Sequence, residues 1–457
     1  MVDLCPTTRV HLLGVGGAGM SAIAVVLRGL GCQVSGSDSA DTPVLDRLRE
    51  FGVNVFVGHN AAQISGADLV ARSTAVGDDN PEVIAARQAG IPVYRRAEIL
   101  TAITALRSTV AVAGTHGKTT TAAMLSHVLM VVGADPGFVV GAVMADGNIG
   151  ARWSHSPWFV VEADESDGTF VELKVNRAVL TSVEPDHLRR DRPVDELEAE
   201  FSRFCAGVDE GLVVCADDPG AMKASEGCDR VLYGSSAEAD YGWRLLERNR
   251  YSTVGEMSFR GEVLGPVTVP MPGDHNALNA MGAVAMACEL GIDPSDAATA
   301  LAGFGGVTRR FERRGEAAGV EFVDDYAHLP TEVAYSLKTA SEGGWGRVVC
   351  VFQPHRYTRT SHLWPAFAHC FEAADVVMIT DIYSAGEVPI PGVSGELVWQ
   401  AVTEAHPESD VSYVPLLDDV ADRLAQILRP GDLCLTLGAG DLVEVPEQVI
   451  SMLVGRR

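Results

Sequence analysis

The chain has 457 residues, of which 47% are hydrophobic and 6% aromatic. Because a domain holds about 100–200 residues, this length predicts two to four domains with sizeable cores. The formal net charge of −26 argues against nucleic acid as a partner, since binding to phosphate backbones requires a basic surface. An anionic substrate would therefore have to be held by local groups of positive charge.

The sequence gives no sign of a membrane segment or of disulfides. No apolar run reaches the roughly 18–20 residues that span a bilayer, and no basic stretch followed by an apolar run opens the chain. The nine cysteines are dispersed without a Cys-x-x-Cys pair, which indicates reduced thiols rather than a disulfide framework or a zinc site. We therefore expect a cytoplasmic protein that binds neither membranes nor nucleic acid.

Short β-rich runs alternate with helical stretches along the chain, which predicts an α/β fold with mainly parallel sheets. Each restart of a nucleotide-type motif marks a new unit, and we expect units at 1–106, 107–308 and 309–457. The expected elements are strands at Arg9–Leu13, Cys32–Gly36, Thr109–Ala113, Trp158–Val161, Ala178–Ser182, Glu321–Asp325, Arg347–Gln353, Val376–Thr380 and Leu433–Leu437, with helices through Leu30 and from Thr120 to about Val132.

A glycine-rich turn, Gly14–Gly19, connects the first expected strand to its helix. Its G-x-G-x-x-G spacing, with Asp38 after the next strand, is typical of a diphosphate bound at a helix N-terminus. NAD and a UDP-sugar both present a diphosphate and a ribose, so the motif leaves both ligands open. An NAD-dependent oxidoreductase would rest on this turn alone and would leave the downstream motifs unexplained.

A second turn, Gly114–Thr119, lies between an apolar strand and an apolar helix. It ends in the Gly-Lys-Thr of a phosphate-binding loop but has Val112 where the strict Walker A pattern has its first glycine. In such a loop the backbone amides cradle phosphates, Lys118 reaches the β- and γ-phosphates, and the Thr119 hydroxyl binds Mg²⁺. The turn therefore predicts an ATP site.

Acidic residues follow the next two expected strands. Glu162–Asp167 contains four acids, which would usually form a solvated loop. Directly after a buried strand and downstream of a phosphate loop, they instead favour a magnesium site. His187 follows the second of these strands, where it could join a second metal ion or orient a phosphoryl oxygen.

Basic residues gather in the third expected unit, where the acidic background makes them conspicuous. Arg309, Arg310, Arg313 and Arg314 surround Phe311, and a further group follows the strand at Arg347–Gln353: His355, Arg356 and Arg359. Since α/β sheets bind ligands beyond the carboxyl ends of their strands, the second group indicates a site for an anion.

These motifs, in this order, resemble the Mur ligases over nearly the whole chain. The segments that carry the resemblance are His11–Met20, Gly36-Ser37-Asp38, Gly58-His59, Asp79–Glu82, Arg96-Ala97-Glu98, Gly114–Thr121, Glu162–Gly168, His275-Asn276 with Asn279, Arg309–Glu312, Asp324–His328 and Val351–Thr360. The shortened phosphate loop is the form that this family uses, which explains the missing glycine.

The resemblance implies three domains: a Rossmann-like N-terminal domain for the UDP-sugar, a central P-loop ATPase-type domain, and a Rossmann-like C-terminal domain for an amino acid. It implies UDP-N-acetylmuramate, L-alanine and ATP as small-molecule substrates, joined through an acyl phosphate. It also implies Mg²⁺, in two ions, and a monomer or weak homodimer.

Carried over residue by residue, the resemblance implies several sets of site residues. The catalytic residues would be Lys118, Glu162, His187 and Arg310, with Thr119, Glu162 and His187 holding metal. The nucleotide would be held by Gly114, Thr115, His116, Gly117, Lys118, Thr119, Thr120, His275, Asn276, Arg310 and Asp324. The other substrates would be held by Gly16, Gly17, Ala18, Gly19, Met20, Asp38, His59, Ser73, Tyr326, His328, His355, Arg356 and Arg359.

The sequence departs from the family pattern in two places. Arg189 and Asp191 stand where an aspartate and a tyrosine are usual, and Leu329 replaces a second histidine. These departures leave open a paralogue that uses another amine or carboxylate. The ligase that salvages a tripeptide is a further alternative, although its opening glycine loop differs. A catalytically inactive binding protein is disfavoured because the catalytic groups named above are present.

Overall fold

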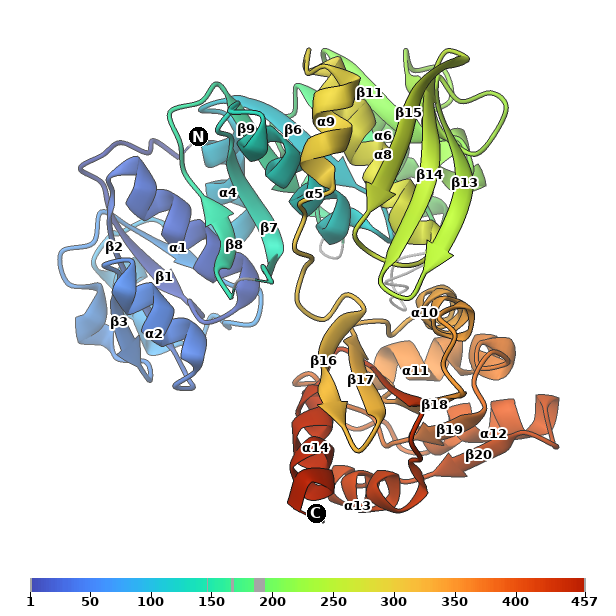
Figure 1. Cartoon of the computed structure of the whole chain (residues 1–457). Coiled ribbons are helices and arrows are strands. Elements are labelled where there is room, and N and C mark those ends of the chain that lie inside the picture. The colour runs from blue at the N-terminus through green and yellow to red at the C-terminus, as the bar shows by residue number, and fades with distance from the viewer. Residues whose placement is uncertain (1, 146, 166–167, 185–193, 456–457) are drawn as a thin grey trace.

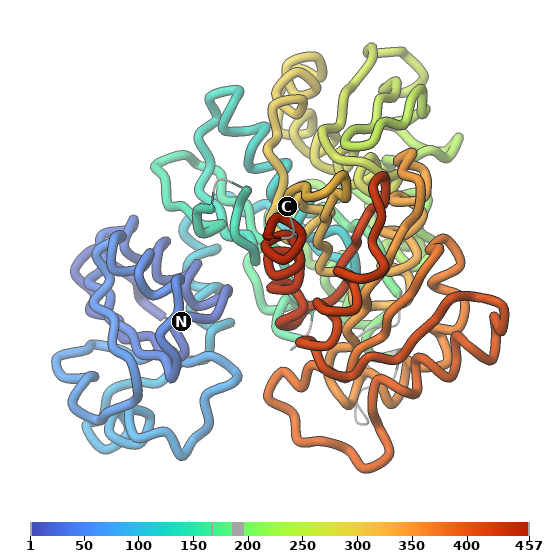
Figure 2. The backbone as a smooth tube through the Cα atoms, turned by 60° about the horizontal axis from the view of Figure 1, so that its bottom comes forward, coloured from blue at the N-terminus to red at the C-terminus, as the bar shows by residue number. Residues whose placement is uncertain are grey.

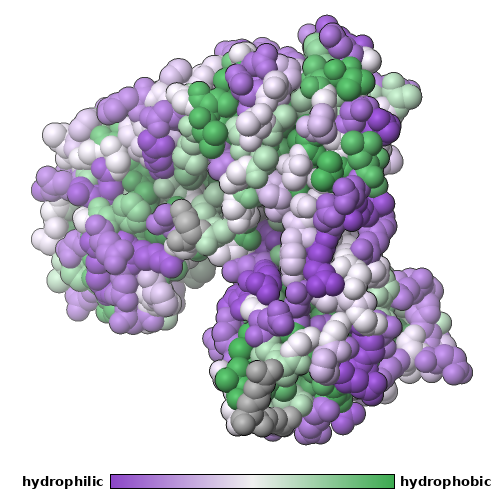
Figure 3. Space-filling view, in the orientation of Figure 1, coloured by the Kyte–Doolittle hydropathy of each residue, from purple (hydrophilic) through white to green (hydrophobic). Residues whose placement is uncertain are grey.

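The computed structural model describes residues 2–145, 147–165, 168–184 and 194–455 as three α/β units, each built around its own sheet (Figure 1). This confirms the predicted fold class. In Figure 1 the first unit (blue) and the third (orange to red) are both attached to the central unit, and the tube in Figure 2 shows the same arrangement from another side. The space-filling view in Figure 3 shows a hollow between the first and third units.

The first unit has five parallel strands in the order β3-β2-β1-β4-β5. Its apolar strand β1 is fully buried after its first residue, as a central parallel strand must be. Its elements are β1 (Arg9–Leu13), α1 (Ala18–Leu30), β2 (Gln33–Asp38), α2 (Pro43–Glu50), β3 (Asn54–Val57), η1 (Ala61–Ile64), β4 (Leu69–Arg72), α3 (Pro81–Gln88), β5 (Val93–Arg95) and α4 (Arg96–Thr104).

The central unit has a ten-stranded sheet in the order β15-β14-β13-β12-β11-β10-β6-β9-β7-β8. Its middle strands are parallel, whereas β8 and the hairpins of β13, β14 and β15 are antiparallel. Its elements are β6 (Ser108–Ala113), α5 (Lys118–Val131), β7 (Gly137–Val143), β8 (Ile149–Arg152), β9 (Trp158–Glu162), η2 (Thr169–Glu172), β10 (Arg177–Leu180), α6 (Val194–Ala206), β11 (Gly211–Cys215), α7 (Pro219–Ala224), β12 (Val231–Gly234), β13 (Tyr241–Asn249), β14 (Ser252–Phe259), β15 (Glu262–Val269), α8 (Asp274–Glu289) and α9 (Pro294–Leu301).

The third unit has six strands in the order β16-β17-β21-β18-β19-β20, all parallel except β16. Helices cover both faces of this sheet, and each face has its own apolar core. Its elements are β16 (Glu312–Ala317), β17 (Val320–Asp325), α10 (Pro330–Glu342), β18 (Arg347–Phe352), α11 (Tyr357–Leu363), η3 (Trp364–His369), β19 (Val376–Ile379), α12 (Glu396–Ala405), β20 (Asp410–Tyr413), α13 (Leu417–Ile427), β21 (Asp432–Leu437), η4 (Asp441–Glu444) and α14 (Val445–Gly455).

The first and central units share one apolar core. Helix α1 packs against β7 and β8, and a single buried cluster runs from Leu12 in the first sheet to Phe159 and Val161 in the central one. At Gly29 an added Cβ would lie 2.6 Å from the Cβ of Trp153, so the helix approaches the central unit as closely as its backbone permits. The two units are therefore joined by a continuous apolar core.

The third unit is joined to the central one by a short connection with an unusual backbone. Arg309 and Phe311 have left-handed φ angles of 59° and 49°. The backbone just before them is fixed to the central unit, because the Thr308 N–H donates to the Val143 oxygen at 3.1 Å. The change of chain direction is thus concentrated in the first residues of the third unit.

The strands predicted from sequence are all present, with each end within two residues of its predicted position. The antiparallel hairpins over residues 241–269 were not predicted. None of the described helices combines the length and the apolar composition needed to cross a bilayer. All nine cysteines are free thiols.

Candidate active site

The turn between β6 and α5 is pressed against two neighbouring elements. Gly114 and Gly117 have positive φ angles of 138° and 78°. A side chain at Gly114 would overlap with Thr181 and Ser182 beyond β10, and one at Gly117 would overlap with the Asn279 amide in α8. Only glycine permits both this backbone and this packing, so the two positions fix the shape of the loop.

Lys118 lies at the N-terminus of α5 with its side chain largely buried. Its Nζ donates to the backbone oxygens of Gly114 and Thr115 at 2.6 and 3.0 Å and pairs with Glu165 at 2.8 Å. Burial lowers the pKa of Lys118, but the carboxylates of Glu165 and Glu162 outweigh this effect and raise it. The ammonium is therefore charged and is held at the loop, where a phosphate would be bound.

Thr119 and Glu162 are brought together although they are 43 residues apart. The Thr119 hydroxyl donates to Glu162 Oε1 at 2.8 Å, and the Gly141 N–H donates to Oε2 at 2.7 Å. An added Cβ at Gly141 would lie 2.7 Å from this carboxylate, so the glycine makes room for it. A hydroxyl and a carboxylate beside a phosphate loop are oxygen ligands that suit Mg²⁺.

Arg310 reaches this group from the third unit. Its Nη2 lies 3.5 Å from the Thr119 hydroxyl, and its guanidinium lies 5.2 Å from the ring centre of Tyr326. A cation from one unit thus lies beside the phosphate loop of another, where it could neutralise phosphate charge.

His116 is bonded to carboxylates of two units. Its Nδ1 lies 3.2 Å from Glu332 in α10, and its Nε2 lies 3.2 Å from Glu184 in the central unit. Burial lowers the pKa of His116, but the two carboxylates outweigh this effect and raise it to about 10. Glu332 also accepts from the N–H groups of His328 and Leu329, so it caps α10 while it holds His116.

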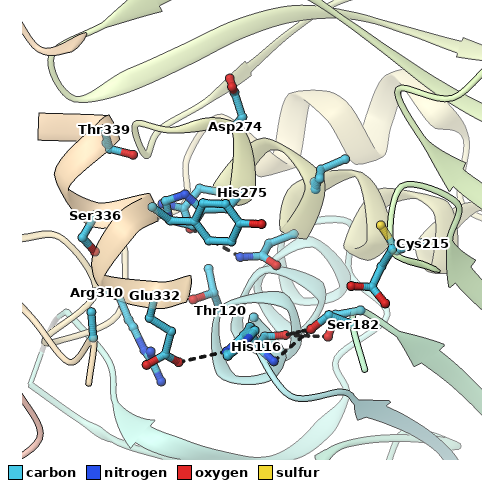
Figure 4. A pocket seen from close by; sticks show the side chains of 18 of the residues that line it. His116, Thr120, Ser182, Cys215, Asp274, His275, Arg310, Glu332, Ser336 and Thr339 are labelled. Carbon is cyan, nitrogen blue, oxygen red and sulfur yellow. Dashed lines mark hydrogen bonds and ion pairs between the residues drawn. The ribbon is translucent and has the colours of Figure 1, made fainter. Parts of the chain in front are cut away.

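A cavity of about 270 Å³ lies between the central and third units beside this histidine (Figure 4). His275 at the start of α8 stacks on Tyr335 of α10 at 5.6 Å and 9°. Burial lowers the pKa of His275 to about 4, so the ring is neutral. Further lining residues include Thr120, Asn276, Leu278, Asn279, Arg310 and Asp325.

Two of the residues that were predicted to bind the nucleotide already use polar atoms in hydrogen bonds or ion pairs within the protein. Asn276 Nδ2 donates to the Pro272 oxygen at 2.8 Å. Asp324 is fully buried, where it pairs with Arg309 at 3.0 Å and accepts from the Thr436 hydroxyl at 2.7 Å. Asp325, rather than Asp324, lines the cavity.

The residues that were predicted to bind the amino acid form a positively charged group beyond β17 and β18. Tyr326 and His328 are in ring contact at 5.4 Å, and His328 and His355 at 5.5 Å. Arg359 donates to His355 Nδ1 at 2.8 Å. Burial and nearby positive charges, first among them His328 and Arg359, lower the pKa of His355 to about 2.

Arg356 stands beside this group at the start of α11, with a left-handed φ of 69°. Its Nε is buried and has no hydrogen-bond partner within the described residues. A guanidinium with a buried, unused Nε–H, next to further cations, is an arrangement that suits a carboxylate ligand.

In the first unit the glycine turn is braced by Asp38. The Gly16 N–H donates to Asp38 Oδ2 at 2.8 Å, so this amide is already used. The amides of Ala18 and Gly19 open α1, where the first N–H groups of a helix have no partner within the helix. An added Cβ at Gly19 would lie 2.8 Å from Arg96 Nη1, so a cation stands beside these amides.

The remaining predicted residues of this unit lie around the turn. Ser73 lies against Gly14, and Met20 is buried in the core. His59 Nδ1 lies 3.0 Å from the Ser37 hydroxyl and 3.1 Å from the fully buried Glu82. His59 is therefore held in place by a buried acid rather than packed as an apolar ring.

Sequence reasoning missed four residues that the structure places at the site: Arg96, Glu184, Glu332 and Tyr335. Arg96 was noted only as part of a motif, and Glu332 and Tyr335 lie on an amphipathic helix, where polar residues usually face solvent. His187 lies outside the described residues, as do Arg189 and Asp191. Leu329 is buried, with 4% of its surface exposed.

Three family models match the chain. They are described as "Mur ligase family, catalytic domain" over residues 9–108, "Mur ligase middle domain" over 112–287, and "Mur ligase, glutamate ligase domain" over 309–440. The chain belongs to the Mur ligase family. This confirms the resemblance seen in the sequence. Mur ligases are ATP-dependent, so membership implies ATP and Mg²⁺.

This Mur ligase matches its relatives over nearly its whole length. It is 42% identical to a UDP-N-acetylmuramate–L-alanine ligase of Pelotomaculum thermopropionicum, with 97% of each chain covered. It is 44% identical to the ligase of the same name from Kineococcus radiotolerans, with 98% of this chain and 97% of the relative covered. The solved UDP-N-acetylmuramate–alanine ligase of Thermotoga maritima has a TM-score of 0.84 at 28% identity, with 98% and 100% covered.

The overlap at Gly117 generates a prediction. We expect Gly117→Ala to weaken ATP binding by about tenfold or more, because the new methyl group displaces the loop or Asn279. Gly133→Ala is the matched control, since its φ of 81° carries the same backbone strain but its Cβ meets open space. Calorimetric titration with ATP measures both. Equal affinities in the two variants would contradict the proposed packing constraint.

The His116 ion pairs predict a pH dependence of stability. The pKa of His116 is about 10 in the folded chain and about 6.5 in the unfolded chain. The stabilisation is therefore complete below about pH 6.5 and is lost as the pH rises towards 10. We expect the melting temperature of the wild type to fall more steeply across this range than that of His116→Gln. Exposed His362→Gln serves as the control and should follow the wild type.

Proposed function

We propose that this Mur ligase joins L-alanine to the lactyl carboxylate of UDP-N-acetylmuramate, with ATP converted to ADP and phosphate. The observation that carries the proposal is the meeting of two units at the phosphate loop, where Arg310 lies 3.5 Å from Thr119. The relatives that bear the name of this activity supply the identity of the two substrates, at 42% and 44% identity over nearly all of their length.

In the first step a lactyl carboxylate oxygen attacks the γ-phosphorus of ATP. The new O–P bond gives an acyl phosphate, and the bond to the ADP oxygen breaks. Because two anions must meet, the site needs fixed positive charge. Lys118 at the loop and Arg310 from the third unit supply it, and the carboxylate of Glu165 holds Lys118 in place.

Thr119 and Glu162 are the residues that would hold Mg²⁺, because their oxygens already face each other beside the phosphate loop. The ion supplies neutralisation of phosphate charge when it is bound. We propose a second ion with His187 among its ligands. The catalytic set is then Lys118, Glu162, His187 and Arg310.

The nucleotide base is proposed to enter the cavity beside His275. The stacked pair of His275 and Tyr335 offers a flat aromatic surface from each of two units. Asn276, in the first turn of α8, forms part of the wall of this cavity. Asp324 contributes indirectly, because its buried ion pair with Arg309 fixes the backbone that carries Arg310.

In the second step the amino group of alanine attacks the acyl carbon, the amine loses a proton, and phosphate leaves the tetrahedral intermediate. We propose that Tyr326, His328, His355, Arg356 and Arg359 hold the carboxylate of the amino acid. The support is their shared position beyond β17 and β18 and the buried, unpartnered Nε of Arg356.

The UDP diphosphate is proposed to bind at the amides of Ala18 and Gly19, with Arg96 as an additional cation. Gly16 and Asp38 then shape the turn rather than contact phosphate, since they are bonded to each other. Gly17, Met20, His59 and Ser73 complete this end of the site.

The units proposed for these roles are 1–106 for the UDP-sugar, 107–308 for ATP and 309–457 for the amino acid. We propose a monomer or weak homodimer, as the resemblance to the Mur ligases implies. A cytoplasmic location is proposed from the nine free thiols, which suit a reducing compartment.

The proposal is tested by phosphate release from ATP with UDP-N-acetylmuramate and single amino acids, with product masses recorded. We expect release to require both substrates and the product to carry one alanyl residue. Release supported by a tripeptide but not by alanine would indicate a salvage ligase. Release with another amine alone would indicate a paralogue, and either result would overturn the proposal.

Lys118→Ala tests the phosphate loop. We expect loss of phosphate release by about a hundredfold or more, because the phosphoryl transfer step loses one of its fixed cations. Binding of UDP-N-acetylmuramate should change little, since its proposed site lies in the first unit. Lys223→Ala is the control, because this lysine is exposed on the central unit and pairs with Glu198. Loss of both ATP turnover and UDP-sugar binding in Lys118→Ala would contradict the division of roles.

A further inference from the structure

Three side chains converge on one point at the surface of the third unit, away from the cavity. His369 ends η3, Glu372 follows three residues later, and His406 directly follows α12. His369 Nδ1 lies 3.0 Å from His406 Nε2 and 3.2 Å from Glu372 Oε1, and the third side of this triangle is 3.3 Å. Within the part of the chain that the structure describes, this is the one group of three such side chains with ligand atoms close enough for one ion.

Hydrogen bonds alone account poorly for this triangle. Each ring nitrogen carries at most one proton, and one N–H can point well at only one partner. With an ionised carboxylate, at most two protons serve the three short separations, so at least one separation holds no hydrogen bond and brings two lone pairs or two N–H groups face to face. If both facing nitrogens carried a proton, two N–H groups would point toward each other across 3.0 Å. A single cation inside the triangle would satisfy all three atoms at once.

The separations also match those of ligands around one ion. Nitrogen and oxygen ligands at about 2.0–2.2 Å from a tetrahedral zinc ion lie about 3.3–3.5 Å from one another. The observed separations are 3.0–3.3 Å, so only small movements would be needed. Two imidazoles and one carboxylate form a donor set that suits zinc and its neighbours among the transition metals, whereas Mg²⁺ prefers oxygen ligands.

We propose that His369, Glu372 and His406 bind one divalent transition-metal ion of the zinc class. The exposed fractions of the three side chains are 72%, 59% and 27%, so the ion would keep an open side for water. None of the three residues lines the cavity between the units. The ion would act as a structural link between η3 and α12.

This link would strengthen a contact that the apolar core already makes. Phe367 in η3 and Phe371 just after it pack on Phe352 of β18, and Val398 and Val402 of α12 belong to the same cluster. His369 and Glu372 lie on the segment that carries these phenylalanines, and His406 lies at the end of the helix. An ion bound by all three would therefore fasten the outer ends of two elements whose inner sides are packed together.

The test is a calorimetric titration of the full-length chain with Zn²⁺, in the presence of millimolar Mg²⁺ so that sites made of oxygen ligands are filled. We expect one binding event that His369→Gln and His406→Gln each weaken by at least about tenfold. Glu372→Gln should weaken it as well. His362→Gln, a change at another exposed histidine of the same unit, should leave it unchanged.

Stability provides a second measurement. Zn²⁺ should raise the melting temperature of the wild type and of His362→Gln, because an ion that binds only the folded chain stabilises it. The rise should be absent in His406→Gln, and circular dichroism of the metal-free variants should match the wild type. Zn²⁺ affinity that stays the same in His369→Gln and His406→Gln would overturn the proposal.

Discussion

The close contact between the phosphate loop and the first turns of α8 is the constraint on which the nucleotide side of the molecule depends. At Gly117 the loop approaches Asn279 so closely that no side chain fits between them. This contact places His275, one turn earlier in α8, at the edge of the loop. The same contact positions the end of α8 on which α10 of the third unit packs, through the stacked rings of His275 and Tyr335. Gly117 therefore helps to set the position of the wall that α8 contributes to the cavity.

The two joints between the units differ in chemistry. The first and central units share a buried apolar core. The contacts at the cavity are mainly polar, with His116 bonded to Glu332 and Thr331 to Glu184, beside the one stacked ring pair of His275 and Tyr335 that the described residues show there. Apolar burial stabilises a permanent joint, while ion pairs and hydrogen bonds can be exchanged for contacts with a ligand. The chemistry of the joints suits a rigid pair of units and a third unit that moves against it.

Much of the fold could be predicted because short runs of apolar residues mark the buried strands. Several of these runs are followed by a glycine-rich turn or by a group of charged residues. The loop at Gly114–Thr119 and the acid Glu162 were found in this way, and the structure brings Thr119 and Glu162 into contact. The hairpins over residues 241–269 were missed, because their strands are half exposed and carry no motif.

Residues that act across a joint were harder to predict. Glu332 and Tyr335 take their place at the site only because α10 faces another unit, and sequence periodicity gives the buried face of a helix but not the partner of its other face. Asp324 and Asp325 illustrate a related problem. Adjacent residues of a strand point to opposite sides, so the choice between them depends on the exact register of β17. The group of His369, Glu372 and His406 could not be predicted either, because His406 is 37 residues away from His369 in the sequence and only the fold brings them together.

The shared core of the first two units also sets where this chain can be divided. Removing the first unit would uncover the faces of β7 and β8 that α1 covers, together with Trp153. A fragment that begins at the central unit would thus expose an apolar strip beside the edge strand β8, and such edges recruit other chains. The third unit has two cores of its own and meets the central unit mainly through polar groups. A cut at the left-handed turn before β16 would separate two bodies that each keep their apolar surfaces covered.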